Sequence, residues 1–115
     1  MRRPWHCYLA LFCLTPLLLA GCGTPMQTCT IAYSVTPATA TLDHTVANNS
    51  QTYTFNVIVP PGCPLPPIHA PIWSVSNTTA ATISNTGVAS CKAAATAPIT
   101  VSTDFPGATA TLICK

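Results

Sequence analysis

Short segments in which apolar and polar residues alternate recur along this chain, and no apolar repeat of helical spacing competes with them. The clearest segment is 52–59, where Tyr53, Phe55 and Val57 share one face of a strand and polar residues share the other. The other segments contain Ile31, Tyr33 and Val35; Trp73 and Val75; Ala81 and Ile83; Val88 to Cys91; Ile99 and Val101; and Ala108, Ala110, Leu112 and Cys114. Turn residues separate them, which predicts a single all-β sandwich of about seven strands.

The N-terminal segment has the organisation of an export signal. Arg2 and Arg3 precede an apolar run at 9–19, which is shorter than the roughly 20 residues that span a bilayer. The run ends in Leu-Ala-Gly-Cys at 19–22, which resembles the lipobox of bacterial lipoproteins. This resemblance implies that residues 1–21 are a signal peptide and that the Cys22 thiol carries lipid, with palmitate among the acyl chains. The alternative is an ordinary secretory signal followed by an unrelated cysteine.

The lipoprotein resemblance also predicts where the protein lies. Residues 22–28 have no apolar pattern and are expected to be a short tether, and residues 29–115 form the folded domain. Gly23 stands where the lipoproteins that this chain resembles carry an aspartate for retention in the inner membrane. We therefore expect a lipid-anchored protein of the bacterial cell envelope, on the outer membrane if the organism has two membranes.

The charge of the chain excludes one class of partner. The net charge of +2 comes from Arg2 and Arg3, which leave with the signal peptide. Four charged side chains remain after Cys22, and they balance: Asp43, Lys92, Asp104 and Lys115. A chain without a basic patch is not expected to bind nucleic acid.

Four cysteines remain once Cys7 and Cys13 leave with the signal peptide and Cys22 takes lipid. They are Cys29, Cys63, Cys91 and Cys114. An even number of cysteines in a small exported domain predicts disulfides, for which the residues alone allow three connectivities. A zinc site is the alternative, but no pair has the Cys-x-x-Cys spacing that such sites favour.

Residues 60–71 hold six prolines and cannot extend a sheet ladder. The segment is predicted to be an extended loop, and a long ordered loop on a β scaffold is a candidate binding site. The candidate residues are Pro60, Pro61, Pro64, Pro66, Pro67 and His69. The alternative is a stiff connector. His69 with Met26 or His44 could also hold copper, but these residues lack the close spacing of a metal site, and no metal or other cofactor is expected.

No catalytic group is predicted. Asp43 and His44 are the only adjacent acid and imidazole, and neighbouring residues of a strand point to opposite faces. The chain has no glutamate to pair with an aspartate for glycoside hydrolysis. We therefore expect a protein that is not an enzyme.

Residues 72–77 (Ile-Trp-Ser-Val-Ser-Asn) and 81–89 (Ala-Thr-Ile-Ser-Asn-Thr-Gly-Val-Ala) resemble the bacterial immunoglobulin-like domain of group 2. In that family a strand with a tryptophan precedes an Ala-Thr-Val/Ile-Ser run and a turn glycine. The resemblance implies an Ig-like sandwich with Trp73 and Ile83 in the core and Gly87 in a tight turn that needs positive φ. The strands that it implies cover residues 30–36, 51–59, 72–76, 80–84, 87–91, 98–103 and 108–114.

The fold implied by this resemblance also predicts the disulfide pairing. With the seven strands running alternately down and up, Cys29 and Cys63 lie at one end of the sandwich. Cys91 and Cys114 lie at the other end. The implied disulfides are therefore Cys29 to Cys63 and Cys91 to Cys114.

Three functions compete on the sequence. The first is a non-catalytic, lipid-anchored protein whose Ig-like domain mediates adhesion or binds another protein, as domains of the resembling family often do. The second is a small accessory subunit that binds polysaccharide or an envelope partner through the loop at 60–71. The third is a metal-binding envelope protein. The first two are separated by the exposure of Trp73 and Tyr53: the first function expects Trp73 in the core, whereas a carbohydrate platform needs an exposed aromatic ring.

Overall fold

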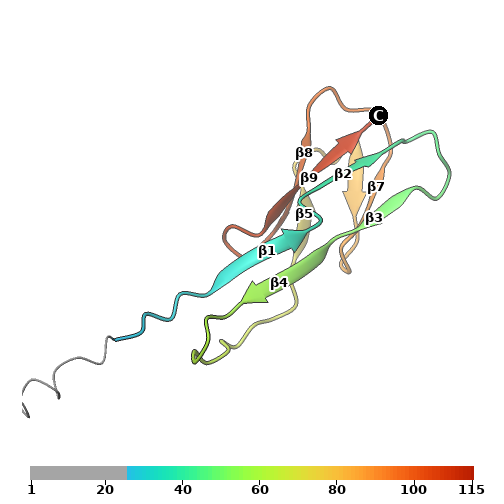
Figure 1. The fold of residues 1–115 in the computed structure, drawn as a ribbon. Coiled ribbons are helices and arrows are strands. Elements are labelled where there is room, and N and C mark those ends of the chain that lie inside the picture. The colour runs from blue at the N-terminus through green and yellow to red at the C-terminus, as the bar shows by residue number, and fades with distance from the viewer. Residues whose placement is uncertain (1–25) are drawn as a thin grey trace, which may run out of the picture.

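The computed structural model of the protein describes residues 26–115, which form an all-β domain without a helix (Figure 1). The predicted signal peptide and Cys22 lie outside the described residues. Within 26–115, accordingly, no helix is long and apolar enough to cross a bilayer. The strands of this part of the chain are β1 (Ala32–Thr36), β2 (Thr39–Leu42), β3 (Ser50–Thr52), β4 (Thr54–Ile58), β5 (Trp73–Val75), β6 (Ala81–Ile83), β7 (Val88–Cys91), β8 (Ile99–Thr103) and β9 (Thr109–Cys114).

The strands form the two layers of an Ig-like sandwich, as predicted. One layer is a four-stranded sheet in the order β2-β9-β8-β5. The other contains the sheet β3-β7-β6, and β4 runs on in line with β3 to pair with β1 (Figure 1). Tyr53 separates β3 from β4: its N–H donates to the carbonyl of Gly87 at 2.8 Å and so continues the β3–β7 register, whereas the residues after it pair with β1. The predicted strand at 51–59 is therefore present but divided.

One strand that was not predicted, together with the division of the predicted strand at 51–59, changes the strand count from about seven to nine. The chain leaves β1 at Pro37 and crosses to the other layer, where β2 pairs in parallel with β9. Proline has no N–H to extend the β1–β4 ladder, which accounts for the end of β1. Residues 39–42 (Thr-Ala-Thr-Leu) contain a single large apolar residue, the buried Leu42, and this short segment takes its strand conformation by pairing with β9.

The core lies between the two layers. Its largest fully buried side chains are Tyr53, Ile99, Val101 and Leu112. They alternate with exposed neighbours: Thr100, between Ile99 and Val101, faces solvent. The period-two pattern therefore predicted the buried faces of β8 and β9 correctly.

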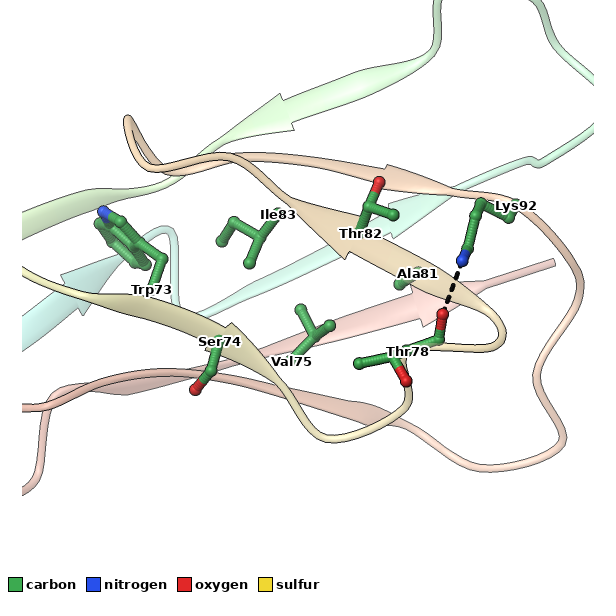
Figure 2. Close-up of a pocket in the computed structure, with 8 residues that line it drawn as sticks. All are labelled: Trp73, Ser74, Val75, Thr78, Ala81, Thr82, Ile83 and Lys92. Carbon is green, nitrogen blue, oxygen red and sulfur yellow. Dashed lines mark hydrogen bonds between the residues drawn. The ribbon is translucent and has the colours of Figure 1, made fainter.

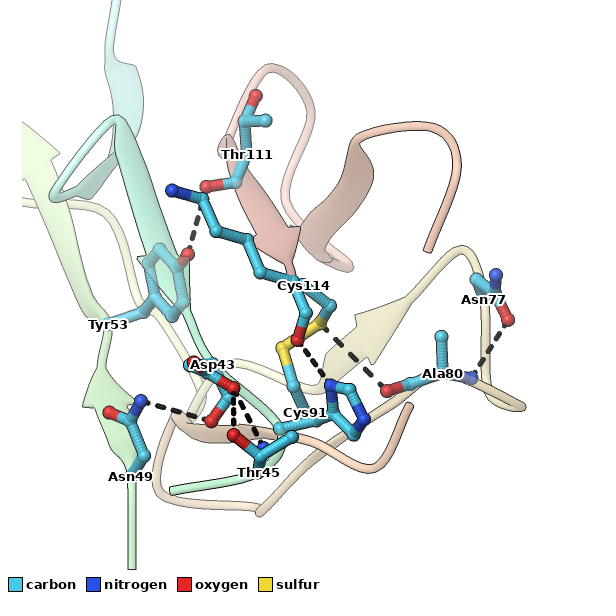
Figure 3. The surroundings of a disulfide bond; sticks show 11 residues. Asp43, Thr45, Asn49, Tyr53, Asn77, Ala80, Cys91, Thr111 and Cys114 are labelled. Carbon is cyan, nitrogen blue, oxygen red and sulfur yellow. Dashed lines mark hydrogen bonds between the residues drawn. A yellow bond between two sulfur atoms is a disulfide. The ribbon is translucent and has the colours of Figure 1, made fainter. Parts of the chain in front are cut away.

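Both implied disulfides are confirmed. Cys29 and Cys63 are bonded, with their Cα atoms 5.6 Å apart, and so are Cys91 and Cys114 at the same separation. The antiparallel pairing of β1 and β4 places the residues before β1 beside those after β4, which explains the first bond. The second joins the end of β7 to the end of β9 and so links the two layers covalently (Figure 3).

Candidate functional site

Two edge strands frame a groove of about 420 Å³ along one side of the sandwich (Figure 2). Within the described sheets, β5 pairs only with β8, and β6 pairs only with β7. No further strand covers the space between β5 and β6, so side chains of both layers are accessible there. The groove is lined by Trp73, Ser74, Val75, Thr78, Ala81, Thr82, Ile83 and Lys92.

The groove has an apolar floor and a polar rim. Trp73, Val75 and Ile83 point into the space between the two strands in Figure 2. Lys92 closes one end, where its ammonium donates to the backbone carbonyl of Thr78 at 2.6 Å. An apolar floor with a few fixed polar groups can hold an apolar side chain of a partner.

Trp73 and Ile83 were both predicted to be core residues, and the structure corrects this in part. Both pack against the core, but each is only half-buried, because β5 and β6 have one open side each. Gly87 has the predicted positive φ, at 84°. A Cβ at Gly87 would lie 3.0 Å from Cζ2 of Trp73, so glycine here leaves room for the indole ring.

A second groove of about 340 Å³ adjoins the same indole ring. Its lining residues come from β3, β4, the β6–β7 turn and the end of the proline-rich segment: Thr52, Tyr53, Thr54, Phe55, Pro71, Trp73, Asn85 and Thr86. Tyr53 is only 1% exposed, and its hydroxyl donates to the carbonyl of Thr111 at 3.0 Å. Burial raises the pKa of this phenol. Tyr53 is therefore a core residue and not a platform for a ligand.

The candidate loop at 60–71 is attached to the sandwich at both ends. Near its start, Cys63 is bonded to Cys29, and the Gln27 amide donates to the carbonyl of Pro61 at 2.7 Å. Its prolines and His69 are mostly exposed. The loop is thus fixed in place, which agrees with both alternatives, a binding surface and a stiff connector.

Near the end of the loop, Asp104 between β8 and β9 makes the attachment. One carboxylate oxygen accepts from the N–H of Ile72 at 2.8 Å, and the other lies 2.5 Å from Nε2 of His69. These two contacts hold the pKa of Asp104 below its ordinary value. The His69 ring also stacks on Phe105, with ring centroids 4.8 Å apart. The pair could not be predicted from the sequence, because its members are 35 residues apart.

The acid and imidazole groups have structural partners. Asp43 accepts hydrogen bonds from the hydroxyl and the N–H of Thr45, which lower the pKa of its carboxyl, and the His44 ring contacts the carbonyl of Lys115. In the hydrogen bonds of residues 26–115, no serine or cysteine joins the His69–Asp104 pair. Over the same range no group of three His, Cys, Asp or Glu side chains could hold a metal ion. The absence of catalysis stays a prediction.

In comparisons with known proteins, no family model matches the chain and no curated protein matches it. The likeness of residues 72–89 to group 2 bacterial Ig-like domains therefore stays a prediction. The fold itself, an Ig-like sandwich with two disulfides, is established by the structure.

Proposed function

We propose that this protein is a non-catalytic, lipid-anchored component of the bacterial cell envelope, and that its domain is of the group 2 Ig-like kind. The domain binds a protein partner through the groove between β5 and β6. The lipobox-like sequence at 19–22 supports the anchor, and Gly23 favours the outer membrane where there are two.

The observation that carries the binding proposal is the half-buried Trp73 in a groove between two open strand edges. Tryptophan is a frequent anchor of protein interfaces because covering its ring removes a large apolar area from water. β5 and β6 are three residues each, and such short edges are poor templates for an added strand. The partner therefore contacts the side chains of Trp73, Val75 and Ile83 more than the backbone.

Site-specific photo-crosslinking in cells tests this proposal. A photoreactive residue replaces either Thr78 or Thr41. Thr78 is exposed and lines the groove, and Thr41 is an exposed residue of β2, the edge of the four-stranded sheet that lies opposite β5. We expect one adduct of defined mass from position 78 and little from position 41. Equal yields from both positions would contradict a binding role for the groove.

The lipid anchor has its own test. Two or three acyl chains hold a protein stably on a bilayer, because each buried CH₂ contributes about 0.8 kcal/mol. Cys22→Ser removes the only thiol of the lipobox-like sequence. The variant is expected to lose incorporation of labelled palmitate and to leave the membrane fraction. Palmitate labelling that persists in the variant would contradict lipidation at Cys22.

The second groove favours a second candidate, a polysaccharide-binding subunit. It places the indole of Trp73 beside Pro71 of the proline-rich segment and the polar side chains of Asn85 and Thr86. An indole flanked by hydroxyl and amide groups suits the face and edge of a sugar ring. Trp73 is the only tryptophan after residue 22, so its fluorescence reports on this groove directly. Saturable changes on titration with soluble oligosaccharides would favour this candidate, and unchanged emission would count against it.

A further inference from the structure

The exposed large apolar side chains of residues 26–115 are concentrated in one part of the domain. Apart from Val46, they belong to the segment before β1 or to residues 58–72: Met26 (98% exposed), Ile58 (55%), Leu65 (66%), Ile68 (41%) and Ile72 (66%). The segment before β1, the end of β4 and the loop at 60–71 lie at one end of the domain (Figure 1), where Cys29 is bonded to Cys63 and Gln27 is hydrogen-bonded to Pro61. We call this surface the apolar end. Such a concentration marks a contact surface.

The charges lie elsewhere. Residues 58–72 contain no Lys, Arg, Asp or Glu. Asp43 and Lys115 lie near the opposite end, where the N–H of His44 donates to the carbonyl of Lys115 at 3.0 Å (Figure 1). Asp104 reaches the loop, but its oxygens accept from Ile72 and contact His69. Contact between the apolar end and a medium of low polarity therefore removes no water from an unpaired charged side chain.

The backbone of the loop suits the boundary of a bilayer. Each of the six prolines at 60–71 lacks an N–H, so the loop presents few backbone donors, and its carbonyls stay hydrated where headgroups and water are present. The disulfide to Cys29 and the contacts of Asp104 hold the loop in place. Leu65 and Ile68 are thus kept exposed and do not collapse onto the core.

The proposed lipid anchor is close to this surface along the chain. Cys22 precedes Cys29 by seven residues, and Cys29 is bonded to Cys63 in the loop. Seven residues span at most about 25 Å when fully extended. The interfacial zone of a bilayer adds only about 5–8 Å on each side of the hydrocarbon. An anchored domain therefore keeps the apolar end within reach of the membrane surface.

We propose that the apolar end docks on the lipid bilayer that holds the anchor, with Leu65, Ile68 and Ile58 at the boundary between headgroups and acyl chains. This inference rests on the proposed lipidation of Cys22. The docked loop fixes the orientation of the sandwich relative to the membrane. Since the surface carries no basic cluster, docking does not depend on anionic lipid.

Fluorescence quenching by brominated lipids tests the proposal in the full lipidated protein, reconstituted into phosphatidylcholine vesicles. Leu65→Trp places a reporter on the apolar end. Val46→Trp is the matched control, because Val46 is 54% exposed and lies three residues after Asp43, away from the loop. We expect the emission of Leu65→Trp to shift to shorter wavelength and to lose most of its added intensity on brominated vesicles. Val46→Trp should keep its added intensity.

The outcomes separate docking from anchoring. If both variants remain on the vesicles and are quenched no more than the parent, the anchor holds and the docking proposal is wrong. If neither variant incorporates palmitate or floats with vesicles, the proposed lipidation fails first. Quenching of Leu65→Trp that requires phosphatidylglycerol would also overturn the proposal, since it would show attraction by charge.

Discussion

Replacement of Gly87 by alanine tests how the β6–β7 turn and the indole ring share space. Gly87 has a φ of 84°, and a left-handed conformation costs a residue with a Cβ about 1–2 kcal/mol. The new Cβ would also lie 2.5 Å from the carbonyl oxygen of Tyr53, far inside contact distance. That oxygen is part of a backbone fixed by the hydrogen bond from the Tyr53 N–H to Gly87. The shifts needed to accommodate this overpacking destabilise the folded state by about a further 1–3 kcal/mol.

Gly107 provides the matched control. Its φ is 78°, but a Cβ there would meet nothing within 4 Å. Gly107→Ala should therefore be destabilised only by the cost of the left-handed backbone conformation. Urea unfolding with both disulfides intact, followed by Trp73 fluorescence, gives the free energy of unfolding of each variant. We expect Gly87→Ala to lose roughly 1–3 kcal/mol more than Gly107→Ala. Equal losses would refute the steric argument and show that Tyr53 moves away at little cost.

Three further predictions concern the interior and the loop. Cys91→Ala with Cys114→Ala removes the link between layers and should cost about 3 kcal/mol in urea unfolding, whereas an unchanged midpoint would show that packing alone holds the layers together. Tyr53→Phe should cost about 1 kcal/mol. Because burial raises the pKa of Tyr53, the parent should also lose stability as pH rises above 10.0, and Tyr53→Phe should not show this loss. The pKa of Asp104 is lowered, so the ionised carboxylate stabilises the end of the loop above pH 3.8, and this stabilisation is lost as pH falls further. In Asp104→Asn, amide exchange at Ile72 should be faster at neutral pH and lack this acid dependence.

The elements that could be predicted from sequence are those whose pattern reflects a covered face. Tyr53 is buried and Phe55 packs against the core, whereas Thr52 and Thr54 beside them are exposed, as the alternation predicted; Val57, predicted on the same face, does not reach the core. Gly87 was predicted to adopt positive φ because few other residues suit such a turn. The disulfide pairs followed once the strand directions implied by the family resemblance were assumed.

Other features depend on contacts between distant segments. β2 exists because β9 pairs with it, and nothing within residues 39–42 specifies that partner. The partial exposure of Trp73 arises because β5 pairs with β8 alone among the strands of residues 26–115, which local alternation cannot report. The contact of His69 with Asp104 requires the fold of the proline-rich loop, which has no periodicity.

The two disulfides also determine how the domain bears mechanical force. The Cys29–Cys63 bond closes a loop that contains β1 to β4, and the Cys91–Cys114 bond closes one that contains β8 and β9. Tension between Cys29 and Cys114 can therefore extend only residues 63–91. That segment reaches roughly 100 Å when stretched, against roughly 300 Å for the same chain with reduced thiols. A load carried between a membrane anchor and a partner in the groove between β5 and β6 would enter the fold at Cys29 and pass through Cys63 to β5, so β1 to β4, the four strands nearest the anchor along the chain, would stay shielded from it.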